Sequence, residues 1–242
     1  MTRGLLTRVT VARIADPNAR SSLIAAARRE FVKNGLMRAR VEDITAACGL
    51  SKGAFYLHFE SKEALFRSLV TELMEHVTVH ANSRDEAYRT EMSGKRINGI
   101  SWGNAVAAVD RREDLALLEL LWEWRDVCAV LLRGSSGTEF EGVLWELIDA
   151  QVARVSRECG ALMKARLIRD DVPGDLLGHM VVGTYMMMAR KLVDLPEKPD
   201  FTPWVGALQA VLTEGLSPRR MPAAAKKKSE PKKKTVSPRK KR

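Results

Sequence analysis

Apolar residues recur every three or four positions along most of the chain, which is the spacing of α-helices that bury one side. The first such stripe consists of Leu23, Ile24, Ala27, Phe31 and Val32. Asp16 and Pro17 predict the start of this helix, because aspartate caps backbone N–H groups and proline has no N–H to leave unpaired. Asn34 and Gly35 predict its end, since glycine tolerates the left-handed conformation in which helices terminate.

Two short helices joined by a sharp turn are predicted next. The apolar spacing places the first over about residues 41–48, and Gly49 permits the turn that follows it. Ser51 is a good N-cap for the second short helix. Leu50 and Phe55 flank this cap at the spacing of a hydrophobic staple, which would fix the angle between the two helices.

A cationic, hydrogen-bonding face is concentrated on the second short helix. Lys52, Tyr56 and His58 lie within seven residues, as expected of a face that enters a DNA groove. A further helix begins after Ser61, and Lys62 stands in its first turn, where unpaired N–H groups attract phosphate. The alternative interpretations are a solvated lysine, a packed tyrosine and a histidine without a ligand.

Together these residues resemble the DNA-binding domain of the tetracycline-repressor (TetR) family. The match extends over residues 20–66 and consists of Ala27…Phe31…Gly35, Val41-x-x-Ile44-x-x-x-x-Gly49-x-Ser51-Lys52-Gly53 and Tyr56-x-His58-Phe59-x-x-Lys62-x-x-Leu65. The resemblance implies that the third helix lies in the major groove. It also implies that Lys52, Gly53 and Tyr56 approach bases or nearby backbone. Tyr56, His58 and Lys62 would then hold phosphates.

One position departs from the family pattern. Arg40 stands where the family usually has a threonine that caps the second helix and contacts phosphate. The arginine removes the cap and adds a stronger cation. The expected DNA-binding residues are therefore Arg40, Ser51, Lys52, Gly53, Ala54, Tyr56, His58 and Lys62.

The rest of the chain also reads as helices, so the predicted fold class is all-α. Helices are expected near residues 84–93, 101–109, 112–133, 138–159, 173–193 and 202–215. Together with the resemblance, this pattern predicts an N-terminal three-helix head with a helix-turn-helix. A C-terminal helical domain that binds a ligand and forms a dimer would follow it.

Tryptophan and methionine are frequent in the C-terminal part, and these side chains line adaptable apolar cavities well. The resemblance implies that a small effector of unknown identity binds there. The expected pocket residues are Trp102, Val106, Trp122, Arg125, Trp145, His179, Tyr185 and Met186. Plain hydrophobic core is the alternative interpretation of any one of them.

Two helices, at 138–159 and 173–193, correspond in order to the pair through which family members dimerise. The expected faces are Leu144, Leu147, Ile148, Gln151 and Val155 on the first helix and Gly178, Val182, Tyr185, Met186 and Ala189 on the second. A two-fold dimer would require a roughly palindromic operator. The alternative is that both faces are buried inside one monomer.

Charge is unevenly distributed along the 242 residues. Residues 1–70 contain 12 basic and 6 acidic residues, residues 71–218 contain 16 and 23, and residues 219–242 contain 12 and 1. We therefore expect only the two basic ends to meet a polyanion. The expected division is a flexible basic arm (1–16), a helix-turn-helix domain (17–63), an effector and dimerisation domain (64–217) and a disordered Lys/Arg-rich tail (218–242).

Other classes of protein receive little support from the sequence. No apolar run is long enough to span a bilayer, and no phosphate loop, nucleophile elbow or paired-carboxylate motif indicates an enzyme or a cofactor. Glu72, His76 and His80 share a helix face, but further metal ligands are not evident, so no metal is expected.

The expected function is therefore a cytoplasmic, ligand-responsive repressor that binds double-stranded operator DNA as a homodimer. The alternative is a nucleoid-associated DNA protein driven by its basic tail, which would add affinity at low salt and little sequence preference.

Overall fold

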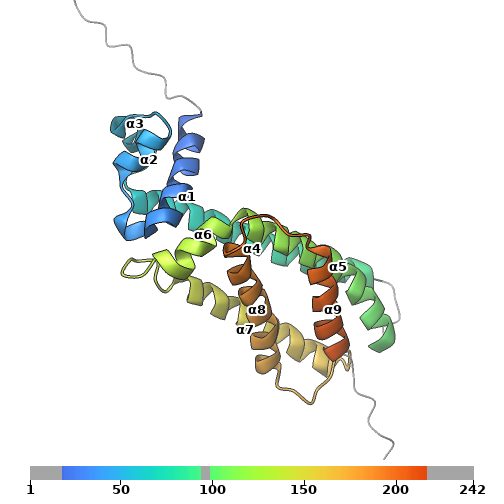
Figure 1. Ribbon diagram of the computed structural model, residues 1–242. Coiled ribbons are helices and arrows are strands. Elements are labelled where there is room, and N and C mark those ends of the chain that lie inside the picture. Colours follow the sequence, from blue (N-terminus) through green and yellow to red (C-terminus); the bar gives the residue numbers. More distant parts are fainter. Residues whose placement is uncertain (1–17, 94–98, 217–242) are drawn as a thin grey trace, which may run out of the picture.

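The computed structural model describes residues 18–93 and 99–216, and the regular secondary structure of this part is all helical, which confirms the fold class. A head made of α1 to α3 lies at one end, and α4 leads from it alongside α5 into a larger group of helices (Figure 1). The elements are α1 (Ala19–Arg38), α2 (Val41–Ala47), α3 (Lys52–Tyr56), α4 (Lys62–Met92), α5 (Gly99–Glu123), α6 (Arg125–Ala129), the π-helix η1 (Val130–Gly134), α7 (Val143–Lys164), α8 (Gly174–Val193) and α9 (Thr202–Leu216). The predicted arm (1–16) and the predicted tail (218–242) lie outside the described residues, as do residues 17, 94–98 and 217 of the two expected domains.

Serine caps begin α3 and α4, as the sequence predicts. Ser51 Oγ accepts a hydrogen bond from the backbone N–H of Ala54 at 3.2 Å. Ser61 Oγ accepts one from the backbone N–H of Ala64 at 3.0 Å. Each cap contributes about 1 kcal/mol by satisfying an N–H group that the first helical turn leaves unpaired.

Glycine supplies the two sharp turns in the head. Gly35 and Gly49 have φ angles of +69° and +68°, a region that other residues rarely adopt. After Gly35 the chain resumes helical geometry over residues 36–38, so this position is a kink within α1. Asp16 and Pro17, the predicted start of α1, lie outside the described residues.

Aromatic rings from three helices fill the centre of the head. Phe31 of α1, Phe55 of α3 and Phe66 of α4 are each at most 1% exposed. The rings of Phe31 and Phe66 meet edge to face, with centroids 5.5 Å apart. Phe140, which precedes α7, lies edge-on to Phe66 at 5.0 Å, so the core of the head continues into the larger group of helices.

Two predicted helix limits around α5 are wrong. Residues 84–93 are the end of the long helix α4, and the predicted gap after residue 109 lies inside α5. Asp110 does not interrupt the helix, because it is buried and paired with Arg84 of α4. The helix instead breaks at Trp124, after which α6 begins.

The start and end of α7 also differ from the prediction. The helix begins at Val143 rather than near residue 138, because Gly137, with φ +74°, lies in a run of turns. It continues through Gly160 to Lys164, where the sequence predicts an end near residue 159. Packing against α8 therefore overrides the weak helix propensity of a glycine.

The helices α7 and α8 approach each other closely at Gly178. A Cβ atom at this position would lie 2.1 Å from Ser156 Oγ and 3.0 Å from the carbonyl oxygen of Val152. A second core joins α5, α8 and α9 and consists of Leu118, Leu192, Phe201 and Val205. None of the described helices combines the length and apolar character needed to cross a bilayer.

Candidate nucleic-acid interface and effector cavity

Five of the eight expected DNA-binding residues lie at or in α3, while Arg40 precedes α2, His58 follows α3 and Lys62 begins α4. Ser51, Lys52, Gly53 and Tyr56 are exposed, while Ala54 is half-buried. Figure 1 shows α3 at the outer end of the head, away from α5 to α9.

Tyr56 is accessible to solvent and packs against a buried side chain. Its side chain is 50% exposed, and its ring meets the buried Phe55 edge to face at 5.4 Å. His58, which follows α3, is half-buried. Phe55 and Phe59 belong to the core, as the sequence predicts.

An acidic residue that the sequence analysis did not single out lies among these cations. Glu42 Oε1 accepts a hydrogen bond from Lys52 Nζ at 2.7 Å, and Glu42 Oε2 lies 3.9 Å from Arg40 Nε. The hydrogen bond raises the pKa of Lys52 and lowers that of Glu42. A phosphate that approaches Lys52 would therefore compete with Glu42.

The contacts of Lys62 differ from those expected of a lysine that only binds phosphate. Its ammonium donates hydrogen bonds to the carbonyl oxygens of Met37 and Ala39, at 2.9 and 2.8 Å. Its side chain is 19% exposed and lies 3.7 Å from the Glu63 carboxylate. Lys62 thus binds the C-terminal end of α1 to the first turn of α4.

Arg40 precedes α2 in an extended conformation. Within the described residues its side chain caps no N–H group of α2, as expected for an arginine that replaces a capping threonine. The side chain is 69% exposed, so its guanidinium is available to an external anion.

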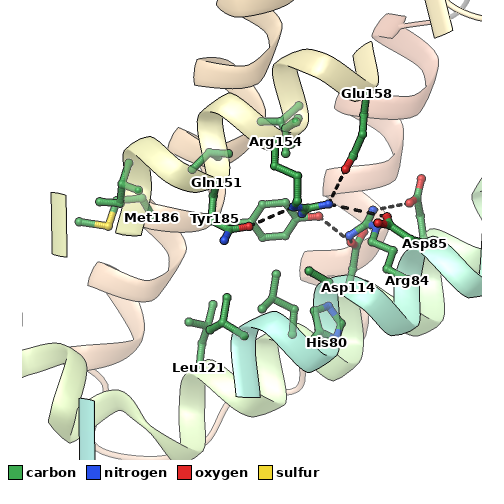
Figure 2. Close-up of a pocket in the computed structure, with 18 of the residues that line it drawn as sticks. His80, Arg84, Asp85, Asp114, Leu121, Gln151, Arg154, Glu158, Tyr185 and Met186 are labelled. Atoms are coloured by element: carbon green, nitrogen blue, oxygen red, sulfur yellow. Dashed lines mark hydrogen bonds and ion pairs between the residues drawn. The ribbon is translucent and has the colours of Figure 1, made fainter. Parts of the chain in front are cut away.

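Helices α4, α5, α7, α8 and α9 surround a cavity of about 590 Å³. Most of its lining is apolar, and the polar residues are concentrated on one side. Figure 2 shows Met186 and Leu121 away from Arg84, Asp85 and Glu158. The apolar lining includes Val77, Leu117, Leu121, Leu147, Ile148, Val182 and Met186.

A buried arginine organises the polar side of the cavity. Arg84 Nη1 binds Asp114 Oδ1 at 2.9 Å, and Nη2 binds Asp110 Oδ1. The Tyr185 hydroxyl donates a hydrogen bond to Asp114 Oδ1 at 2.6 Å, and the Tyr88 hydroxyl donates one to Asp110 Oδ1. These contacts connect α4, α5 and α8.

A second arginine lies on the same wall. Arg154 Nη1 of α7 binds Glu158 Oε1 at 2.6 Å and faces Asp85 Oδ1 at 3.7 Å. These side chains are more accessible than the Arg84 group, with exposed fractions of 29% for Arg154 and 44% for Glu158.

Burial shifts the acid–base properties of these groups. It raises the pKa of Asp114 against the opposing effect of Arg84, and it raises the pKa of Glu158. The pKa values of Tyr88 and Tyr185 are also raised by burial, so both hydroxyls stay protonated. Burial lowers the pKa of His80, so this cavity residue is neutral near pH 7.

The expected effector residues are only partly brought together. Tyr185 and Met186 line the cavity. Trp122 packs against the core between α5, α8 and α9, with the guanidinium of Arg125 above its ring at 3.9 Å. Trp145 is 61% exposed.

The other expected pocket residues lie on the surface or cannot be placed. His179 is exposed and bonded to its own helix through the carbonyl oxygen of Asp175. Trp102 and Val106 belong to α5, but their side chains lie outside the described part. Four polar residues of the cavity were not predicted, although Arg84 and Tyr88, and likewise Asp110 and Asp114, have the i, i+4 spacing of one helix face.

Most of the residues expected on the dimer faces of α7 and α8 are directed toward the cavity. Nine of the ten residues line the cavity inside one chain, and they are Leu144, Leu147, Ile148, Gln151, Val155, Val182, Tyr185, Met186 and Ala189. Gly178 contacts Ser156 of α7 instead. An inward and an outward apolar face have the same helical spacing, so periodicity cannot distinguish them.

Metal-ligand groups were also sought in the described part of the chain. It contains no cluster of three or more His, Cys, Asp or Glu side chains that could hold a metal ion. His76 lies 4.0 Å from Glu72, while His80 faces Glu113 at 3.8 Å.

Sequence relatives identify the family. Residues 23–69 match the model of the bacterial regulatory proteins of the tetR family. The HTH-type transcriptional repressor Rv1474c of Mycobacterium tuberculosis is 30% identical over 159 residues, which cover 65% of this chain and 73% of the relative. The chain therefore belongs to the tetR family of bacterial regulatory proteins.

Solved structures share the fold at low sequence identity. The MbdR regulator from Azoarcus sp. CIB has a TM-score of 0.61 and 19% identity, covering 82% of this chain and 98% of the other. FadR from Bacillus subtilis, solved in complex with stearoyl-CoA, has a TM-score of 0.53 and 17% identity, covering 81% and 98%. Three further curated relatives match over short segments, and the chain spans 14%, 41% and 33% of their lengths.

Proposed function

We propose that this protein is a DNA-binding transcriptional repressor that a small effector releases from its operator. One observation carries the proposal: the α2–turn–α3 unit presents Ser51, Lys52, Gly53 and Tyr56 to solvent at the outer end of the head. In a helix-turn-helix, the second helix enters the major groove and its exposed side chains reach base edges or nearby phosphates.

The residues divide by chemistry. Lys52 and Arg40 are exposed cations suited to phosphate oxygens, and the half-buried His58, which follows α3, is a further hydrogen-bonding group. Tyr56 is placed to contact bases or sugar. We propose that Lys62 acts mainly by fixing α1 against α4, because its ammonium already binds two carbonyl oxygens.

Dimerisation would use the outer side of α8. Leu176, Met180 and Met187 are each at least 50% exposed, and their spacing places them on one side of this helix. Trp145 of α7 is a further large exposed apolar side chain. Covering such a surface with a second copy would place two heads on one DNA face, as a palindromic operator requires.

Release of the protein from its operator would begin with effector binding in the cavity. A volume of about 590 Å³ falls in the range of small-molecule sites. Leu131 of η1 lines the cavity, and Gly134 at the end of η1 lies so near Gly35 of α1 that a Cβ on Gly134 would be 3.2 Å from the Gly35 Cα. An effector that prefers one arrangement of η1 would thereby favour one placement of the head.

The test is selection of bound sites from random DNA, followed by footprinting. A discrete, roughly palindromic site supports the proposal. Uniform coverage would instead favour a nucleoid-associated protein. Small molecules that release the selected site would then identify the effector.

Tyr56→Ala should weaken binding to the selected site about tenfold, because a contact made by the exposed ring is lost. Circular dichroism should show unchanged helicity. Val79→Ala is the matched control, since Val79 is 66% exposed on α4 beyond the head. Equal affinities of Tyr56→Ala and the parent protein in gel-shift titrations would refute the assignment of this residue.

A further inference from the structure

Among the described residues that line the cavity, carboxylates outnumber guanidinium groups: Asp85, Asp110, Asp114 and Glu158 stand against Arg84, Arg89 and Arg154, and Arg89 is paired with Glu86. Arg84 is shared by two carboxylates, Asp110 and Asp114, which are 11% and 4% exposed. The hydroxyls of Tyr88 and Tyr185 donate hydrogen bonds to these carboxylates, but neutral donors do not balance a charge. Within the described residues, this group therefore sets two carboxylates against a single guanidinium.

A second group of residues on the same side of the cavity also has more carboxylates than guanidinium groups. Arg154 is shared by Glu158 and Asp85, so one guanidinium again faces two carboxylates. The two groups are neighbours, since Asp85 follows Arg84 directly on α4. Figure 2 shows Arg84 and Asp114 together with Arg154, Asp85 and Glu158 on one side of the cavity.

Burying an unmatched charge in an apolar environment is unfavourable, and it raises the pKa of a carboxyl group. Burial is the main cause of the raised pKa values of Asp114 and Glu158. His80 does not supply the missing positive charge, because burial keeps its imidazole neutral near pH 7. A positive charge brought by a ligand would satisfy these carboxylates.

We propose that the cavity takes an apolar molecule bearing one protonated nitrogen, with the nitrogen beside Asp114 and Glu158 and the apolar body toward Leu121 and Met186. This inference rests on the proposed function only in treating the cavity as the effector site. A carboxylate ligand would instead meet the excess negative charge.

The test compares three probes that share one chain length: decylamine, decan-1-ol and decanoate. Each is titrated into the full-length protein by isothermal calorimetry near neutral pH, without DNA. Decylamine should bind about tenfold more tightly than decan-1-ol, and decanoate should bind most weakly. Because no DNA is present, the result does not depend on whether the protein binds an operator.

Two variants test whether Asp114 and Glu158 are the carboxylates that bind the ammonium group. Asp114→Asn and Glu158→Gln should each reduce decylamine affinity about tenfold while leaving decan-1-ol affinity nearly unchanged. Glu75→Gln is the control, because it removes a carboxylate from an exposed position of α4 outside the cavity lining. Glu158 is partly exposed, so its variant remains informative if Asp114→Asn fails to fold.

Each outcome of these titrations either supports or overturns the proposal. A preference for decylamine that both folded variants lose and Glu75→Gln keeps would support the proposal. A preference for decan-1-ol or decanoate, no binding of decylamine, or equal loss in the control would overturn it.

Discussion

Several single residues have structural roles that differ from those their residue type suggests. Lys62 has the position of a phosphate ligand, yet its ammonium binds the carbonyl oxygens at the end of α1. Gly178 lies in the middle of α8, where glycine costs stability, yet it allows α7 to approach. His80 is a cavity residue whose Nε2 is buried and has no hydrogen-bond partner within the described ranges. Gly178 and His80 each lead to a testable prediction.

Gly178→Ala should destabilise the fold by about 1–3 kcal/mol, because the added methyl group would crowd the α7 backbone. Urea unfolding at fixed protein concentration measures the change. Gly206→Ala, inside the helix α9, is the control. A Cβ there meets no described atom within 4 Å, so the free energy of unfolding should rise by about 0.5–1 kcal/mol. Equal effects of the two substitutions would contradict the close approach.

His80 should make stability fall in mild acid. Burial lowers its pKa in the folded protein, so the unfolded chain binds the proton more readily. The stabilising contribution of the neutral ring is therefore complete above the ordinary histidine pKa of about 6.5 and is lost as the pH falls below it. Glu113 on α5, Arg84 on α4 and Arg154 on α7 face the ring and modulate this loss.

His80→Gln should lessen the decrease in unfolding free energy between about pH 7.5 and about pH 5.5, measured by urea titration. Asp114 and Glu158 act in the opposite direction, because their pKa values are raised, but they are present in both proteins. His76→Gln, at an exposed position, should leave the pH dependence as it is in the parent protein. A parent-like response of His80→Gln would refute the assignment.

At the scale of elements, the joint between the head and the larger domain depends on α1, α6 and η1. Arg28 Nε and Nη2 of α1 bind both carboxylate oxygens of Asp126, each at 2.6 Å, and Nη2 also donates to the carbonyl oxygen of Glu123. Its guanidinium lies above the Trp124 ring at 5.0 Å. The π-helix η1 follows directly, and such irregular helices often occur at functional sites.

The Arg28–Asp126 pair should therefore be strongly coupled. A double-mutant cycle with Arg28→Met and Asp126→Leu should give a coupling energy of about 1–3 kcal/mol in urea unfolding, since the pair is bidentate and partly buried. The exposed pair Arg89–Glu86 is the comparison and should give about 0.3–0.5 kcal/mol. Similar values for both pairs would count against a rigid joint.

At the scale of the whole molecule, the arrangement leaves α8 with two apolar sides. One side lines the cavity through Val182, Tyr185 and Met186, and the other exposes Met180 and Met187. The exposed side is the surface proposed for dimerisation, and the cavity lies directly behind it. Binding in the cavity and the separation of two heads would therefore be linked through the same helix.

Met180→Glu should convert the proposed dimer to monomers at micromolar concentration, because each interface would bury two unpaired carboxylates. Sedimentation velocity measures the change in mass. Val79→Glu introduces the same charge at another exposed apolar position and should leave the mass unchanged. Should the parent protein itself sediment as a monomer, the dimer proposal would be lost.

The sequence alone determined the head. Its signals are local: Ser51 and Ser61 cap helices within three residues, and Gly35 and Gly49 take conformations that few other residues adopt. Helix propensity and spacing also predicted an all-helical chain. Such features depend on neighbours in the sequence, so they can be read without a structure.

Only the tertiary structure decided which residues meet in the larger domain. Arg84 meets carboxylates 26 and 30 residues away, and Asp114 meets Tyr185 71 residues away. No local pattern specifies such pairs, because they depend on how helices are placed around the cavity. The same holds for α7 and α8, since apolar spacing shows that a face is buried but not whether a cavity, a core or a second copy covers it.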